Sequence, residues 1–309
     1  MADTTTPSRD DTFSVSPTFE QTGERSLRGE LARGLWRSKP ALFSVLVLVA
    51  VAALAVAAPV LSPHDPTRLH LRDVLVPPAF IEGGDPAYPL GTDSLGRDIL
   101  SQLIFGSRVS LAVGLTVVAA GGSLGTVLGL LSGYYGGIVD DIIMRWAEIQ
   151  LAFPFILMAI TFLVVLGPGL QNLIIVLAVG SWMTYARVVR GQVISLREKE
   201  FVEAARAVGV RNTMIIIRHI LPNAVQPLIV VGSFSVARTI IAEASLSFLG
   251  LGVRASTPTW GAMLANGREY ITDAWWLVTF PGVAIMIAVL AINTLGDWLR
   301  DHLDPRLRF

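Results

Sequence analysis

The sequence REKEFVEAARAVGVRNTMIIIRHILP, residues 197–222, is the one long polar and helix-forming interruption in the largely apolar second half of the chain. Because the runs on either side are apolar and long enough to cross a bilayer, we expect this stretch to lie outside the membrane, where a soluble partner can dock. Gly209 predicts the C-terminal end of a short helix in this stretch. The apolar residues before it recur at helical spacing and predict a narrow stripe on one helix face: Leu196, Phe201, Ala204, Ala205 and Val208.

Three short elements follow one another in this stretch: Glu203-Ala204-Ala205, then Gly209, then Leu221-Pro222. In their residues and their spacing they resemble the EAA cytoplasmic loop of ABC-importer permease subunits. His219 replaces the usual isoleucine of that loop, and RHILPN at this place is typical of the peptide-importer branch. The resemblance implies a coupling helix that sits in a cleft of an ATPase subunit and transmits its closure. It implies the following coupling residues: Phe201, Glu203, Ala204, Ala205, Arg206, Gly209, Leu221 and Pro222. From the residues alone, a surface amphipathic helix between two spans is the alternative.

The composition is typical of a protein that crosses the membrane several times. Hydrophobic residues make up 52% of the 309 residues, charged residues only 16%, and the mean hydropathy is +0.60. The formal net charge is zero, which gives no indication of nucleic-acid binding. The chain has no cysteine, which excludes disulfides, thiolate metal sites and a cysteine nucleophile.

The apolar runs predict an all-α membrane protein with six transmembrane helices within residues 41–309, which the resemblance implies to be a permease domain. The spans are expected at about 41–61, 109–131, 146–166, 172–189, 222–244 and 277–295. Loops outside the cell are expected at 62–108 and 245–276, and the cytoplasmic coupling loop at 190–221. Residues 1–40 form a predicted cytoplasmic tail, disordered to about residue 24. A signal peptide with a cleavage site at residues 55–57 is the alternative for the first run, but the long polar lead and the length of the run favour an anchor.

The basic residues predict the orientation of the six spans. Most Lys and Arg residues flank the same ends of the spans if both termini are cytoplasmic, and that assignment also places the coupling loop in the cytoplasm.

A second group of motifs lies in the two expected external loops. Residues 88–98, YPLGTDSLGRD, continue to GSRVSL at 106–111, and residues 246–252 and 258–264 read LSFLGLG and PTWGAML. These segments resemble the C-type permease subunit of bacterial dipeptide/oligopeptide ABC importers, and the resemblance covers about residues 41–309. It implies the ABC importer type I permease fold and a place in the bacterial inner membrane. His64, Asp93 and Asp98 could suggest a metal site, but their spacing favours turn and cap roles.

Four glycines recur at every fourth position of the second span: Gly121, Gly125, Gly129 and Gly133. Such a stripe predicts a tight seam with another helix. Lipid provides no hydrophobic drive for helices to associate, so close contact between their backbones must hold them together. A gated pore wall is the alternative. In the third span, Pro154 predicts a kink.

Arg238 and Glu243 are expected deep in the fifth span, where an ionisable group is a candidate for a pathway or subunit contact. The alternative for Arg238 is that it snorkels to the outer headgroups or pairs with a carboxylate of a partner subunit. Trp260 is a further candidate for contact with substrate or a delivery protein. Trp275 and Trp276 are interpreted as interfacial anchors.

The sequence has no catalytic motif of its own. Neither of its lysines follows a glycine-rich loop, so this chain cannot supply a P-loop. We therefore expect no enzyme activity and no cofactor or metal on this chain. The resemblance implies ATP and magnesium on two partner P-loop ATPase subunits, together with a second homologous permease, an extracytoplasmic peptide-binding protein and membrane lipid.

Two other functional classes remain as alternatives. One is a stand-alone ion-coupled secondary transporter, for which internal inverted repeats and an intramembrane carboxylate or an interrupted helix pair would be expected. The other is a membrane scaffold that recruits a soluble partner through its polar helix. Within the family, similar permeases carry dipeptides, longer peptides, glutathione and nickel chelates, and peptides are the expected substrate because they are the commonest.

Overall fold

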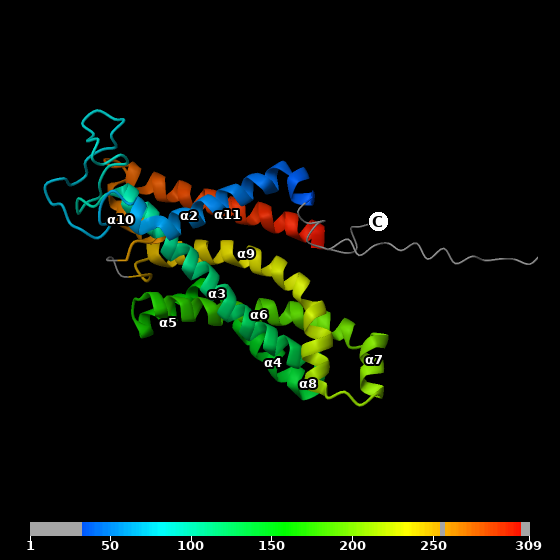
Figure 1. Ribbon diagram of the computed structural model, residues 1–309. Coiled ribbons are helices and arrows are strands. Elements are labelled where there is room, and N and C mark those ends of the chain that lie inside the picture. The colour runs from blue at the N-terminus through cyan, green and yellow to red at the C-terminus, as the bar shows by residue number, and fades with distance from the viewer. Residues whose placement is uncertain (1–32, 254–256, 304–309) are drawn as a thin grey trace, which may run out of the picture.

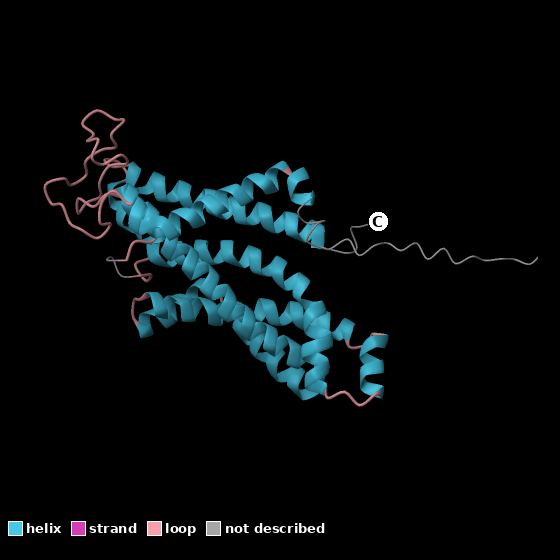
Figure 2. Cartoon of the chain, in the orientation of Figure 1, coloured by secondary structure: helices cyan, strands magenta, loops and turns pink. Residues whose placement is uncertain are grey.

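The structure, a computed structural model, describes residues 33–253 and 257–303, and this part of the chain is built of helices joined by loops (Figure 2). The N-terminal tail predicted to be disordered lies outside the described residues. The elements are α2 (Lys39–Leu61), α3 (Ile99–Tyr135), α4 (Gly137–Leu151), α5 (Phe155–Leu166), α6 (Leu170–Leu196), α7 (Glu200–Ala207), α8 (Asn212–Met214), a π-helix (Ile215–Ile220), α9 (Leu221–Phe248), α10 (Trp260–Gly267), a 3₁₀ turn (Arg268–Tyr270) and α11 (Trp276–Leu303).

The long helices confirm the predicted all-α membrane fold. Within the described residues, five helices are long and apolar enough to cross a bilayer: α2, α3, α6, the continuous helix at 212–248, and α11. The pair α4–α5 makes a sixth span if its two halves count as one broken crossing.

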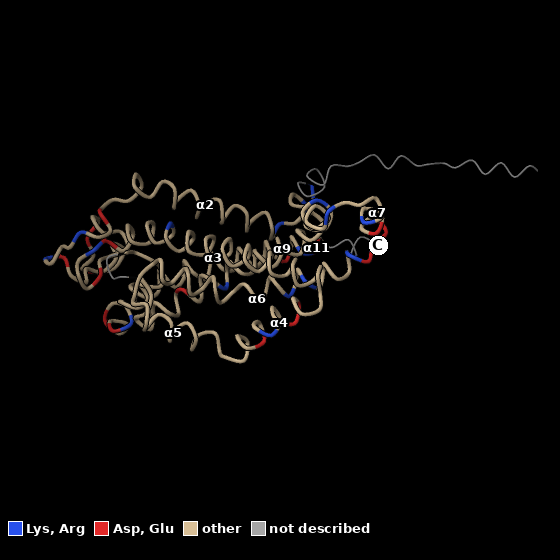
Figure 3. The backbone as a smooth tube through the Cα atoms, turned by 90° about the horizontal axis from the view of Figure 1, so that it is seen from below, with Lys and Arg blue, Asp and Glu red and all other residues tan. Residues whose placement is uncertain are grey.

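The helices are arranged so that α2 and α11 lie on one side of α3 and α9, and α4, α5 and α6 lie on the other (Figure 1). The long loop at 62–98 and α10 are at one end of the bundle, and α7 and α8 are at the opposite end. The N-terminal end of α2 and the C-terminal end of α11 also lie toward the α7 end. Charged residues gather at the two ends of the bundle and are sparse between them (Figure 3). This distribution places the bilayer across the middle of the helices.

Helix α3 begins earlier than the sequence predicts. The residues 99–108 were expected in the external loop, but they form the first turns of a 37-residue helix. The Asp98 side chain caps this helix by accepting hydrogen bonds from the backbone N–H groups of Leu100 (3.3 Å) and Ser101 (3.0 Å). The helix is thus started by a capping residue outside the apolar run, which hydropathy does not detect.

The third predicted span, 146–166, is broken rather than kinked. The axes of α4 and α5 differ by 89° across a break of three residues that ends at Pro154. Pro154 has no N–H to continue the helix, and its extended backbone (ψ 123°) starts α5 in a new direction. The first half also begins earlier than predicted, at Gly137, directly after Gly136 with φ of +64°.

The coupling loop expected at 190–221 is shorter than predicted. Helix α6 continues to Leu196, and helical structure resumes at Asn212. Only residues 197–211, which include α7, connect the two long helices.

The glycine stripe of α3 lies against α6, which is the most extensive helix–helix contact of the described chain. A Cβ atom would lie 2.8 Å from the Ala178 carbonyl oxygen at Gly121 and 2.6 Å from the Ala186 carbonyl oxygen at Gly129. At Gly125 a Cβ would overlap the Trp182 carbonyl oxygen, and at Gly133 it would be 2.9 Å from that of Arg190. These glycines therefore allow the backbones of two helices to touch along four turns.

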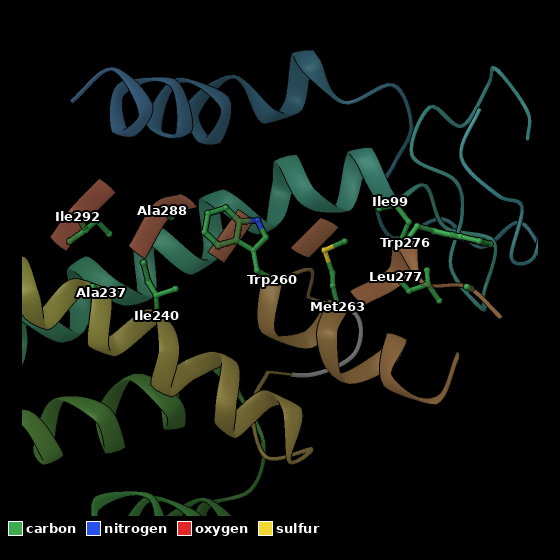
Figure 4. Packing of buried hydrophobic residues seen from close by; sticks show 10 residues of the cluster. Ile99, Ala237, Ile240, Trp260, Met263, Trp276, Leu277, Ala288 and Ile292 are labelled. Atoms are coloured by element: carbon green, nitrogen blue, oxygen red, sulfur yellow. The ribbon is translucent and has the colours of Figure 1, made fainter. Parts of the chain in front are cut away.

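The outer ends of α3, α9, α10 and α11 enclose an apolar core around Trp260 (Figure 4). Trp260 is 3% exposed, and its indole N–H donates to the Leu103 carbonyl oxygen at 3.1 Å. Trp276 is also buried, and its indole N–H donates to the Thr92 carbonyl oxygen at 3.2 Å. The interpretation of Trp276 as an interfacial anchor is therefore wrong, because its N–H binds a loop of the same chain; its neighbour Trp275 is exposed.

The carboxylates of the external loop organise its turns. Asp93 accepts hydrogen bonds from the backbone N–H groups of Leu95 and Arg97 and pairs with the Arg97 guanidinium at 2.7 Å. Burial raises the pKa of the Tyr88 hydroxyl, which stays protonated and donates to Asp73 at 2.9 Å. Within the described residues no group of three or more His, Asp or Glu side chains has the arrangement of a metal site.

We predict that Gly125→Ala destabilises the purified chain in detergent and that Gly191→Ala does not. Gly125 faces the Trp182 backbone, which cannot move aside, whereas a Cβ at Gly191 on α6 meets nothing within 4 Å. Overpacking of this kind costs about 1–3 kcal/mol. A thermal melt followed by light scattering or intrinsic fluorescence measures the difference, and equal melting temperatures for the two variants would contradict the seam.

Candidate functional site

Helix α7 is a short helix with a well-defined end. Its backbone enters through Lys199 in an extended conformation and leaves through Gly209 with φ of +78°. The Gly209 N–H donates to the Arg206 carbonyl oxygen, and the Val210 N–H donates to that of Ala205, each at 3.0 Å. This pair of bonds is the Schellman motif, whose left-handed position favours glycine. The predicted helix stop at Gly209 therefore has a clear backbone cause.

One face of α7 is anchored to the rest of the chain. Val202 is fully buried and Ala205 is 7% exposed. Both belong to an apolar cluster with residues from α3, α6 and the π-helix. Beside this cluster, the Tyr134 hydroxyl donates to Asn212 Oδ1 at 2.8 Å, and the Arg206 guanidinium lies 5.3 Å from the centre of the Tyr134 ring. These contacts attach α7 to the inner ends of α3 and of the helix that leads into α9.

The opposite face of α7 is exposed and partly apolar. Phe201 is 43% exposed and Val208 79%, and Glu203 and Ala204 are exposed between them. The predicted stripe puts Ala205 on the same face as Phe201, Ala204 and Val208, which is wrong, because Ala205 faces inward. It also missed Val202, although the spacing of Val202 and Ala205 by three residues is the signal of a shared helix face.

The last two coupling candidates lie apart from this exposed face. Leu221 packs at the edge of the same apolar cluster, and Pro222 is exposed in the first turn of α9. The preceding six residues form a π-helix. Because Pro222 has no N–H and its ring crowds the carbonyl four residues earlier, a locally widened helix accommodates it. The structure therefore brings together the residues 201–209 and assigns 221–222 to the support beneath them.

Two arginines fix the ends of the helices around α7. Arg190 forms a bidentate ion pair with Asp140 of α4, with both N–O distances at 2.6 Å. Arg197 donates to the Gly133 carbonyl oxygen at 3.1 Å. Sequence reasoning missed Asp140, because nothing in the local pattern connects α4 with a residue 50 positions later.

Three candidates for a pathway or subunit contact have different surroundings. Glu243 is 1% exposed, and its Oε1 accepts hydrogen bonds from the hydroxyls of Ser247 and Thr259, each at 2.9 Å. Trp260 is buried beside it in the outer core, so the contacts of both residues seen here lie within the chain. Arg238 differs from them, because it is exposed and lines a cavity of about 410 Å³ between the α4–α5 break, α6 and α9.

We predict that Val202→Ala lowers the thermal stability of the chain more than Phe201→Ala does. The first change removes two buried methyl groups, at a cost of about 1–2 kcal/mol, while the second removes a larger but exposed side chain. The midpoint of thermal unfolding in detergent is the measurement. A greater loss from the phenylalanine would show that α7 is packed through its other face.

Comparison with known proteins identifies the family. Residues 125–309 match the family described as the inner membrane component of binding-protein-dependent transport systems, and residues 26–78 match the N-terminal transmembrane domain of oligopeptide transport permease C.

Curated relatives match almost the whole chain. A di/tripeptide transport system permease protein of Pseudomonas aeruginosa is 42% identical over 277 residues, covering 88% of this chain and 91% of the relative. A glutathione transport system permease protein of Pectobacterium atrosepticum is 41% identical over 292 residues, covering 94% and 95%.

The fold is similar to that of the solved methionine ABC transporter MetNI in an inward-facing conformation, with a TM-score of 0.52 at 23% identity over 65% of this chain and 96% of that chain. The chain therefore belongs to the family of binding-protein-dependent transport system inner membrane components, in the dipeptide/oligopeptide permease branch of the bacterial inner membrane.

Proposed function

We propose that this chain is the membrane-spanning subunit of an ATP-driven importer of di- or oligopeptides, and that the exposed face of α7 couples it to an ATPase subunit. The observation that carries the coupling role is that α7 buries one face against the chain and exposes apolar residues on the other. Val202 and Ala205 hold the helix to the chain, while Phe201, Ala204 and Val208 present apolar surface away from it. A helix that packed only on its own chain would turn its apolar side chains inward. The exposed apolar face of α7 therefore fits a helix held in a groove of a partner.

The proposed partners follow from the family. They are a second homologous permease, two P-loop ATPase subunits that bind ATP and magnesium, and an extracytoplasmic peptide-binding protein. This chain would bind no cofactor and catalyse no reaction alone. Peptides are proposed as substrates because the names of relatives include di/tripeptide, dipeptide and glutathione transport. Family membership and fold decide against the alternative of a stand-alone ion-coupled transporter.

Movement of α7 has a direct route to the spans. The buried face of α7 packs on the inner end of α3 and on the π-helix that continues into α9. If an ATPase subunit pulls on the exposed face of α7, packed side chains carry the displacement into α3 and α9. Packed helices change between discrete arrangements rather than bend gradually, which suits an alternation between outward-facing and inward-facing states.

We predict that Glu203→Ala and Gly209→Asp abolish ATP-driven peptide uptake while the protein stays inserted in the membrane. Glu203 lies on the exposed face, and Gly209→Asp adds a negative charge at the C-terminal end of α7, where the helix dipole disfavours it. Uptake of a labelled dipeptide into cells or proteoliposomes that contain the whole importer is the measurement, with membrane content checked by immunoblot. Normal uptake by both variants would overturn the coupling assignment.

Three further substitutions, at Gly209 and at Gly250, serve as comparisons and controls. Gly209→Asn is expected to retain more uptake than Gly209→Val, because asparagine tolerates the left-handed conformation and a β-branched residue does not. Gly250 at the outer end of α9 has φ of +80°, so Gly250→Val imposes a similar strain far from α7. It should leave the ATPase subunits attached to the complex, whereas Gly209→Val should release them.

A further inference from the structure

A cavity opens where α4 and α5 part. Its volume is about 410 Å³, and it is bounded by the break at Pro154, by α6 and by α9. Its walls combine apolar side chains, among them Phe153, Phe155 and Met158, with the polar residues Thr184 and Ser235. This volume is in the range of about 300–1,000 Å³ that is typical of sites for small ligands.

The wall of the cavity is held by an interhelical hydrogen-bond bridge. Gln150 of α4 accepts a hydrogen bond from the Trp182 indole N–H at 2.8 Å, and its amide donates to the Val179 carbonyl oxygen at 2.9 Å. Both functional ends of the Gln150 side chain are thus engaged with α6. The polar lining is therefore a fixed part of the fold in this conformation.

Arg238 is the one cationic side chain that lines this cavity, and it has no ion pair or hydrogen bond with any residue in the described ranges. By contrast, Arg97, Arg145 and Arg190 each pair with a carboxylate. Arg238 is ten residues from the outer end of α9 at Phe248, which corresponds to about 15 Å along the helix. A guanidinium at this depth, on a cavity rather than in lipid, is stabilised further by a negatively charged group within reach.

The chemistry of the guanidinium restricts what that group can be. Arginine offers five N–H donors and no acceptor, in a planar fork that matches a carboxylate bidentately. The apolar part of the lining includes Met158 and Met183, whose flexible side chains adapt to ligands of different shape. A site with one fixed cation and an adaptable apolar wall suits a class of ligands that share a carboxylate and vary in their side chains.

We propose that Arg238 holds the C-terminal carboxylate of a peptide during its passage through this cavity. The proposal rests on the proposed function, because it takes the peptide cargo as the source of the carboxylate. It assigns to this chain a contact that every free peptide can make, whatever its sequence. The methionines and phenylalanines of the wall then accommodate side chains without selecting strongly among them.

The test compares a labelled dipeptide with its C-terminal amide, using the complete importer with its binding protein in proteoliposomes supplied with ATP. The ratio of the two uptake efficiencies is measured for the wild type and for Arg238→Gln. Because any preference of the binding protein is the same in both preparations, a change in this ratio comes from the permease. Loss of one charge-assisted contact predicts about a 10- to 100-fold fall in uptake efficiency for the free acid and little change for the amide.

Matched variants make the result specific. Arg145→Gln removes another arginine, whose guanidinium is exposed and paired with Glu148 outside the cavity, and it should leave the ratio unchanged. Arg238→Lys keeps the charge but loses the fork, so it should give an intermediate ratio. If Arg238→Gln fails to assemble, Arg238→Met, which keeps an unbranched chain without the charge, takes its place and must give the same collapse of the ratio.

The outcomes separate this inference from the proposed function. If the wild type imports peptides but acid and amide uptake fall equally in Arg238→Gln, then Arg238 pairs with a partner subunit or supports the fold, and the inference is wrong. An unchanged ratio in Arg238→Gln or Arg238→Met also overturns it. If the wild-type importer takes up no peptide in response to ATP, the proposed function itself fails.

Discussion

Helices in a bilayer gain nothing by turning apolar side chains toward one another, because lipid chains are as apolar as leucine, so close contact between backbones has to hold them together. In this protein that contact is the seam between α3 and α6. Its glycines place the α3 backbone against carbonyl oxygens of α6 from Ala178 to Arg190. Because α3 also packs on α2 and α9, the seam fixes the position of most of the bundle.

The same seam connects the two ends of the molecule. At the inner end, Gly133 lies against α6, and its carbonyl oxygen accepts the hydrogen bond from Arg197 that leads into α7. At the outer end, α3 begins at the Asp98 cap and packs on Trp260 of α10. One continuous helix thus contacts α7, the element proposed to face an ATPase, at one end and the external core at the other. Such a helix can transmit a displacement across the membrane without any local unfolding.

Features that depend on local backbone geometry or on contact with lipid can be predicted from the sequence. Features that depend on packing partners far along the chain cannot. Hydropathy predicts the spans. Gly209 predicts the end of α7, and the glycine stripe predicts the close contact between α3 and another helix. The first turns of α3 were missed because the cap lies outside the apolar run. The sequence predicts a kink at Pro154 where the structure has an 89° break, because a proline alone does not determine how far a helix turns. The faces of α7 were misassigned, because Val202 finds its partners in residues far along the chain.

The central claim, that the exposed face of α7 docks on an ATPase subunit, can be tested most directly by site-specific cross-linking. The chain has no cysteine, so Phe201→Cys and Leu71→Cys each introduce its only thiol, at an exposed position. A photoreactive maleimide is attached to each thiol in the purified chain before the complex is reassembled. The account predicts a cross-linked product with a P-loop ATPase from position 201 and little or none from position 71, which lies in the loop at the other end of the bundle. Equal yields from both positions, or no ATPase product from position 201, would contradict it.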